Sequence, residues 1–180
     1  MSAHSDPRVN PDAGASSAGG ASAPGRVVLV TGAAKRIGRA LALGFAAKGW
    51  DVAVHYGTSL DEAESVVAEI RALGRRACAL KADLAVEQEV AQLVPACAAA
   101  LGRPRCIVNN ASLFVEDTAD TLGYESLLQL MAVNVGAPLV LARALHAATP
   151  SVACENEAER GVVINVLDQK LYNLNPDYLS

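Results

Sequence analysis

Short runs of β-branched residues alternate with longer amphipathic stretches along most of this chain, and this alternation limits its possible folds more than any other feature. Five runs predict strands, at Val27–Val30, Val52–Val54, Ala77–Leu80, Ile107–Val108 and Val162–Val166. Four stretches with apolar residues at helical spacing predict helices, at Ile37–Lys48, Leu60–Leu73, Val86–Leu101 and Tyr124–Ala148. Because strands that alternate with helices build right-handed βαβ units, we expect an α/β fold with a doubly wound parallel sheet and helices on both faces.

The composition agrees with a buried sheet. Hydrophobic residues make up 52% of the chain and aromatic residues only 4%, so Ala, Val, Leu and Ile must build the core. Residues 1–25 are rich in Ser, Ala, Gly and Pro and contain too few large apolar groups to offset the entropy lost on ordering. We therefore expect a disordered tail at 1–25 and a single domain at 26–180.

Charge and residue spacing disfavour several classes of partner. The net charge is −4 and no basic run stands out, so we expect no nucleic-acid binding. The four cysteines contain no CxxC pair and the three histidines are scattered, which indicates buried thiols in a cytoplasmic protein and no metal site. No secretory signal is visible and no stretch approaches the roughly 20 apolar residues of a membrane span, so we expect no membrane contact.

A turn of mostly small residues, Thr31-Gly32-Ala33-Ala34-Lys35-Arg36-Ile37-Gly38, follows the first predicted strand. Gly32 would permit a tight turn, and Gly38 would let the following helix pack closely against the strand. Such a turn brings a diphosphate to backbone N–H groups and to the positive end of the helix dipole. The strict GxGxxG fingerprint is absent, but the position after the first strand of a βαβ series predicts dinucleotide binding rather than an ordinary strand-to-helix turn.

The end of the second strand bears on the choice of dinucleotide. An NAD site normally carries an acidic residue there, whereas this strand ends in His55-Tyr56-Gly57-Thr58-Ser59. Lys35, Arg36 and the Ser59 hydroxyl could instead meet a 2′-phosphate, which favours NADPH unless the two cations are merely solvated. Ser59 and Glu62 also have the spacing of a capping box at the start of the second helix.

From Arg26 to Ser180 these features resemble the short-chain dehydrogenase/reductase family, which has a Rossmann-like fold. The resemblance implies that Asp83, followed by Leu84, contacts the adenine. It implies that Asn109-Asn110-Ala111 closes the adenosine side of the cofactor, and that Asn134 belongs to a proton relay. Pro138 supports the last role, because it has no N–H and so leaves the Asn134 carbonyl without its helical partner. A kinked but chemically idle helix is the alternative.

Three details resemble the pteridine reductase branch of the family. Arg36 replaces a common glycine, Ser112 and Phe114 follow the Asn-Asn-Ala motif, and Asp168 stands at the place of the usual catalytic serine. The resemblance implies that a pterin stacks on Phe114 and that Asp168 helps to supply a proton. Phe114 as a core residue and Asp168 as a turn cap are the ordinary alternatives.

The Tyr-x-x-x-Lys pair on which the family's chemistry depends is missing from this sequence. The resemblance places the tyrosine at position 180 or 181, and position 180 is Ser180. We expect a fragment of a longer, homo-oligomeric NADPH-dependent pteridine reductase, inactive as it stands. A ketone or 3-oxoacyl reductase is the alternative within the family. A short protein that binds NADPH without catalysis is the alternative from another class.

Overall fold

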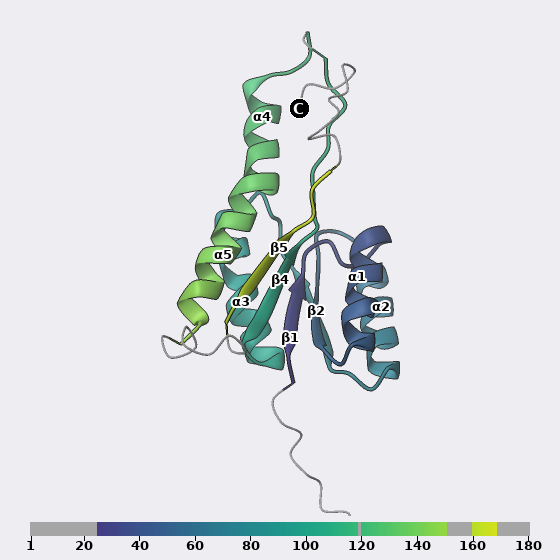
Figure 1. The fold of residues 1–180 in the computed structure, drawn as a ribbon. Helices are drawn as coiled ribbons and strands as arrows, with labels where there is room; N and C mark the ends of the chain where they lie inside the picture. The colour runs from purple at the N-terminus through teal and green to yellow at the C-terminus, as the bar shows by residue number, and fades with distance from the viewer. Residues whose placement is uncertain (1–24, 119, 151–159, 169–180) are drawn as a thin grey trace, which may run out of the picture.

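Five parallel strands form a single sheet in the order β3-β2-β1-β4-β5 (Figure 1). The strands are β1 Val27–Val30, β2 Asp51–Tyr56, β3 Ala77–Lys81, β4 Pro104–Asn109 and β5 Val162–Asn165. This computed structural model describes residues 25–118, 120–150 and 160–168, so the predicted tail lies outside the described residues except for Gly25. The chain moves outward from β1 to β3 and then returns to β4 on the other side. The doubly wound, Rossmann-like α/β fold is thus confirmed, with its switch point between β1 and β4.

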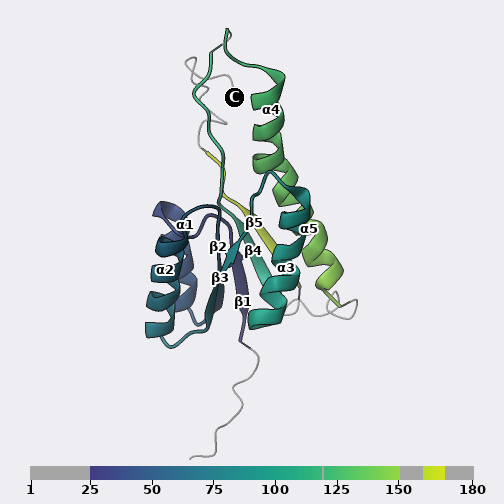
Figure 2. The same ribbon diagram turned by 180° about the vertical axis from the view of Figure 1, so that it is seen from behind.

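Helices cover both faces of the sheet (Figures 1 and 2). On one face lie α1, Arg36–Ala47, and α2, Leu60–Ala72. On the other lie α3, Glu87–Leu101, and α5, Ala137–Ala148. A further helix, α4, Tyr124–Met131, extends beyond the carboxyl ends of the strands.

The apolar core has two parts because successive side chains of a strand point to opposite faces. Val28 and Val30 of β1 belong to the cluster under α1 and α2. Val27 and Leu29 belong to the cluster under α3 and α5. Burial on both faces explains why β1 is apolar at every position rather than at every second one.

The predicted helix Tyr124–Ala148 contains a π-helical turn, η1, at Ala132–Gly136. Pro138 follows in the first turn of α5, and its missing N–H accounts for an interruption of the regular hydrogen-bond series at this point. The 25 residues are long and apolar enough to cross a membrane by length and composition, which corrects the prediction that no stretch approaches that size. Core helices of soluble proteins pass the same test but are mostly buried, whereas 17% of the apolar window is buried here. Leu141 and Leu145 are among the buried residues.

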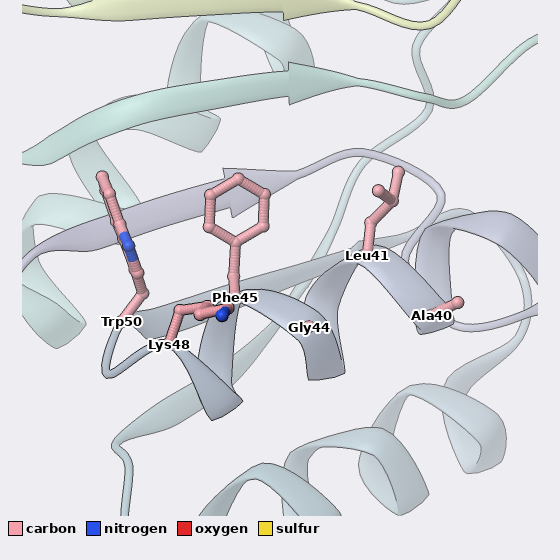
Figure 3. A pocket seen from close by; sticks show the side chains of 6 residues that line it. All are labelled: Ala40, Leu41, Gly44, Phe45, Lys48 and Trp50. Carbon is pink, nitrogen blue, oxygen red and sulfur yellow. The ribbon is translucent and has the colours of Figure 1, made fainter.

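A shallow groove of about 300 Å³ lies along α1, where the Leu41, Phe45 and Trp50 side chains point toward the strands (Figure 3). Phe45 and Trp50 meet edge to face there with ring centroids 5.4 Å apart, and the Arg26 guanidinium lies 4.8 Å from the Trp50 ring. The other lining residues are Ala40, Gly44 and Lys48. The groove begins beyond the first turn of α1, so it is separate from the turn that precedes this helix.

Candidate functional site

Two glycines shape the turn between β1 and α1. Gly32 has a φ of +61°, in the left-handed region, and a Cβ on it would lie 3.1 Å from Ala111. A Cβ on Gly38 would lie 2.1 Å from the Gly32 carbonyl oxygen and 2.6 Å from Nδ2 of Asn110. Side chains at these positions would therefore force the turn, the helix and the loop after β4 apart.

The amino end of α1 presents unpaired donors to this turn. Lys35 precedes the helix in an extended conformation and makes no side-chain cap. The N–H groups of Arg36, Ile37 and Gly38 have no acceptor within the helix, since the first helical bond runs from Arg39 N–H to the Lys35 carbonyl. Arg36 has a φ of +50°, unusual for a residue with a side chain. Donors and helix dipole together fit an anionic diphosphate.

Thr31, which was not among the predicted site residues, connects the turn to the end of β4. It is buried, and its N–H donates to the Val108 carbonyl at 2.9 Å. Its hydroxyl oxygen accepts from the N–H groups of Asn110 and Ala111, each at 3.0 Å. Its position directly before the turn glycine, Gly32, is the feature by which the sequence could have indicated this role.

Asn109 ends β4, and Asn110 begins the loop that follows it. Both belong to the Asn-Asn-Ala motif described above. Nδ2 of Asn110 donates to the carbonyls of Thr31, at 2.9 Å, and Gly32, at 3.3 Å, so Asn110 fastens the glycine turn. Nδ2 of Asn109 donates to Oδ1 of Asn165 at 2.8 Å and links β4 to β5. Within the described residues the buried Oδ1 of Asn109 has no hydrogen-bond partner, which leaves an acceptor at the switch point.

His55 lies beneath the glycine turn. Its Nδ1 accepts from the Gly32 N–H at 3.0 Å, and its Nε2 lies 3.2 Å from the Ala82 carbonyl. Nε2 must therefore carry the proton, because Nδ1 acts as an acceptor. Burial lowers the pKa of this imidazole, although the contact with the Ala82 carbonyl opposes that effect. Neutral His55 thus positions Gly32 relative to the end of β3.

The charged residues at the end of β2 are arranged differently from the sequence prediction. Ser59 precedes α2 as expected, but it makes no side-chain cap, so the predicted capping box is wrong. The Glu62 carboxylate instead lies 2.7 Å from Nζ of Lys35. A hydrogen bond from Lys35 lowers the pKa of Glu62. Tyr56 is half-buried and Arg36 is exposed beside this pair of helix ends.

Asp83 and Leu84 form the turn after β3. Oδ1 of Asp83 accepts from the Ala85 N–H at 2.9 Å, and the Asp83 N–H donates to Oε2 of Glu89 at 2.7 Å. The Asp83 side chain is exposed and Leu84 is buried. The carboxylate therefore orders an exposed turn at the carboxyl edge of the sheet.

Asn134 holds the loop that contains the predicted substrate residues. Its Oδ1 accepts from the Leu113 N–H at 2.8 Å, and its Nδ2 donates to the Leu113 carbonyl at 2.9 Å. Ser112 and Phe114 flank Leu113, and Phe114 is 63% exposed, so it is not a core residue. Asp168 is exposed and lies three residues beyond the end of β5. Residues 169–180, which include the expected tyrosine position Ser180, lie outside the described residues.

Three cysteines of the described part, Cys78, Cys97 and Cys106, are free thiols. Burial raises the pKa of Cys97 to about 12 and that of Cys106 to about 11, so both remain protonated. In the described ranges no group of three or more His, Cys, Asp or Glu residues is placed to hold a metal ion.

The turn, the asparagine loop and the strand order together match a known family. A family model for short chain dehydrogenases matches residues 26–169. The chain belongs to the short chain dehydrogenase family.

Several known proteins are similar to this chain. FolM alternative dihydrofolate reductase 1 from Brucella suis, solved in complex with NADP, is 37% identical to this chain and has a TM-score of 0.77. The match covers 86% of this chain and 61% of the Brucella chain. A short chain dehydrogenase from Burkholderia cenocepacia, also solved with NADP, is 33% identical with a TM-score of 0.76, covering 85% and 59%. A 3-oxoacyl (acyl-carrier-protein) reductase from Staphylococcus epidermidis is 42% identical over 85 residues, which cover 47% of this chain and 35% of that protein.

Proposed function

We propose that this protein is an NADPH-dependent oxidoreductase that transfers hydride to a pteridine of the dihydropterin or folate type. The observation that supports the cofactor part of the proposal is the cradle formed by Gly32 and Gly38 next to the N–H groups at the start of α1, which have no acceptor within the helix. The bound cofactor would supply the hydride. The substrate is a small molecule, and we propose a cytoplasmic enzyme that is a homo-oligomer in its full-length form.

The cofactor choice follows from the charges around the end of β2. No acidic residue occurs from His55 to Ser59, while Lys35 and Arg36 lie at the start of the adjacent helix. The Brucella and Burkholderia relatives were both solved with NADP, in agreement with this choice. We propose that His55 contributes to cofactor binding indirectly, through its hydrogen bond with Gly32. The proposed cofactor-binding residues are Gly32, Lys35, Arg36, Ile37, Gly38, His55, Tyr56, Ser59, Asp83, Leu84, Asn110, Ala111 and Ser112.

The pteridine assignment depends on the exposed loop after β4. Phe114 offers an exposed aromatic face for a flat heterocycle, with Ser112 and Arg36 as polar contacts. The Brucella protein is named an alternative dihydrofolate reductase. The Staphylococcus relative is named a 3-oxoacyl reductase, and it supports reduction of a 3-oxoacyl thioester or ketone as a second candidate.

Proton donation to the substrate is the step for which residues are missing from these 180 residues. Asp168 is the proposed donor, and Asn134, in the π-helical turn, is the proposed relay residue. The sequence contains no Tyr-x-x-x-Lys pair. We propose that these 180 residues bind the cofactor without appreciable turnover, so that a non-catalytic NADPH-binding role is the alternative from another class.

Calorimetric titration of the 180-residue chain with NADPH and NADH tests the cofactor proposal. We expect tighter binding of NADPH, and we expect Arg36→Ala to weaken it selectively, by about 1.5–3 kcal/mol for one charge-assisted contact. Equal or tighter binding of NADH would contradict the proposal. A separate assay with NADPH and dihydropterin should show no appreciable turnover, and turnover at a rate typical of enzymes would contradict the proposed role of the missing pair.

A further inference from the structure

The amino ends of α1 and α2 are joined by one ion pair. Nζ of Lys35 lies 2.7 Å from Oε1 of Glu62, and the two side chains are 54% and 47% exposed. Lys35 is the residue directly before α1, and Glu62 is in the first turn of α2. The two helices lie next to each other on the same face of the sheet (Figure 1). The pair therefore spans the gap between two helix amino ends, immediately beyond the end of β2.

This gap is where a dinucleotide's adenosine ribose would lie, because the ribose binds at the carboxyl end of the second strand. A 2′-phosphate at that place would be attracted by Lys35, Arg36 and the two helix dipoles. The Glu62 carboxylate already uses one of these cations and has the same charge sign as the phosphate. Its oxygen would therefore compete with a phosphate oxygen for Lys35.

We propose that Glu62 is a specificity-determining residue, an internal competitor that reduces the affinity of this site for a 2′-phosphate by binding Lys35. The inference rests on the proposed NADPH binding. In the unliganded protein the carboxylate holds Lys35 in place. When a 2′-phosphate binds, Lys35 turns to it and the nearby carboxylate repels it. NADH has a neutral 2′-hydroxyl, so its binding does not meet this repulsion.

A second ion pair between the same two helices is an ordinary surface contact and serves as a matched control for the Lys35–Glu62 pair. Arg39 of α1 pairs with Glu69 of α2, with side chains 44% and 39% exposed. It joins the same two helices, with each partner at least one helical turn further along. Exposed pairs of this kind contribute little to stability, so neither glutamate is needed for the fold. Glu62 and Glu69 thus differ mainly in their distance from the end of β2.

The test compares the 180-residue chain with its Glu62→Gln and Glu69→Gln variants by titration with NADPH and NADH at low and high salt. We expect Glu62→Gln to tighten NADPH binding about threefold to tenfold at low salt, with NADH affinity changed less than about twofold. Glu69→Gln should leave both affinities unchanged. In a Lys35→Met background the NADPH-selective gain from Glu62→Gln should shrink, because the competition for Lys35 is gone.

Three results would overturn the inference. They are an unchanged NADPH affinity in Glu62→Gln, an equal gain for both dinucleotides, and an equal effect of Glu69→Gln. Failure of the proposed function looks different, because the unsubstituted chain would then bind NADH at least as tightly as NADPH. Even in that case the ratio of the two affinities in Glu62→Gln still decides whether the carboxylate opposes a 2′-phosphate.

Discussion

Strands β1 and β5 both begin with three large aliphatic residues, but their environments are opposite. β1 reads Val-Val-Leu-Val and is buried at every residue, whereas β5 reads Val-Val-Ile-Asn and is exposed at every residue. β1 lies between two strands and under helices on both faces, while β5 is the edge strand of the described sheet. An apolar run thus specifies a strand, and the place of that strand in the sheet decides how much it contributes to stability.

The helices show the same contrast. Four apolar residues of α2 are buried against the sheet, namely Ala63, Val66, Val67 and Ile70. Along α4, η1 and α5, large apolar side chains at helical spacing are exposed instead, namely Tyr124, Leu128, Met131, Val135 and Leu139. We therefore distinguish a tightly packed region, formed by β1, β2, β4, α1 and α2, from a loosely packed region, formed by α4, η1, the exposed face of α5 and β5.

The largest expected single effect is the cost of removing a strand side chain, and this cost should differ between the two regions. Ile107→Ala in β4 should lower the free energy of unfolding by about 4 kcal/mol, because Ile107 is fully buried. Ile164→Ala in β5 should cost about 1 kcal/mol, because Ile164 is 41% exposed and leaves no enclosed cavity. Urea unfolding of both variants measures the two losses. Equal losses would show that β5 is as well covered as β4.

Smaller single effects, of opposite sign, are expected at two glycines. Gly38→Ala should destabilise the protein by about 2–3 kcal/mol, since its Cβ would lie 2.1 Å from the Gly32 carbonyl oxygen. Gly136→Ala should stabilise it by about 0.5 kcal/mol, because the new Cβ would lie 3.6 Å from the Met131 carbonyl oxygen and alanine favours a helix. Thermal unfolding of both variants measures this. A harmless Gly38→Ala would contradict the close packing described for the turn.

The smallest difference concerns ion pairs. Asp51 is buried, and its carboxylate accepts from Arg75 at 2.7 Å and from Arg76 Nε at 2.9 Å. Asp51→Asn should therefore cost about 2 kcal/mol. Glu87→Gln, which breaks the exposed pair with Arg143 between α3 and α5, should cost less than about 0.5 kcal/mol.

The pH dependence of stability provides the check on Asp51. Desolvation raises the pKa of this carboxyl, but hydrogen bonds from Arg76 and the charge of Arg75 outweigh it, so the pKa lies below its usual value. A lowered pKa stabilises the folded state above the unfolded value of about 3.9, and this contribution is lost as the pH falls through the folded pKa. Denaturant unfolding between pH 3 and 6 should show a steeper loss in the unsubstituted protein than in Asp51→Asn. Parallel profiles would contradict this role.

Local patterns predicted much of the fold. The helical spacing of apolar residues places α2 to within one residue, and the run Val27–Val30 is β1 as predicted. The break in the helix near Asn134 was also predictable, because the missing N–H of Pro138 is a covalent property. The turn glycines were recognisable because only a residue without a side chain tolerates their backbone position and close contacts.

Contacts between distant residues were decided only by the tertiary structure. Glu62 has the spacing of a capping box with Ser59, yet it pairs with Lys35 of another helix. Thr31 meets Asn110 only because β1 and β4 are neighbours, and β5 is exposed because it lies at an edge. The sequence by itself determined which segments form strands and helices, because backbone geometry imposes periods that depend on near neighbours alone. The partners of polar side chains and the burial of each strand depend on the order of strands across the sheet, which no local pattern contains.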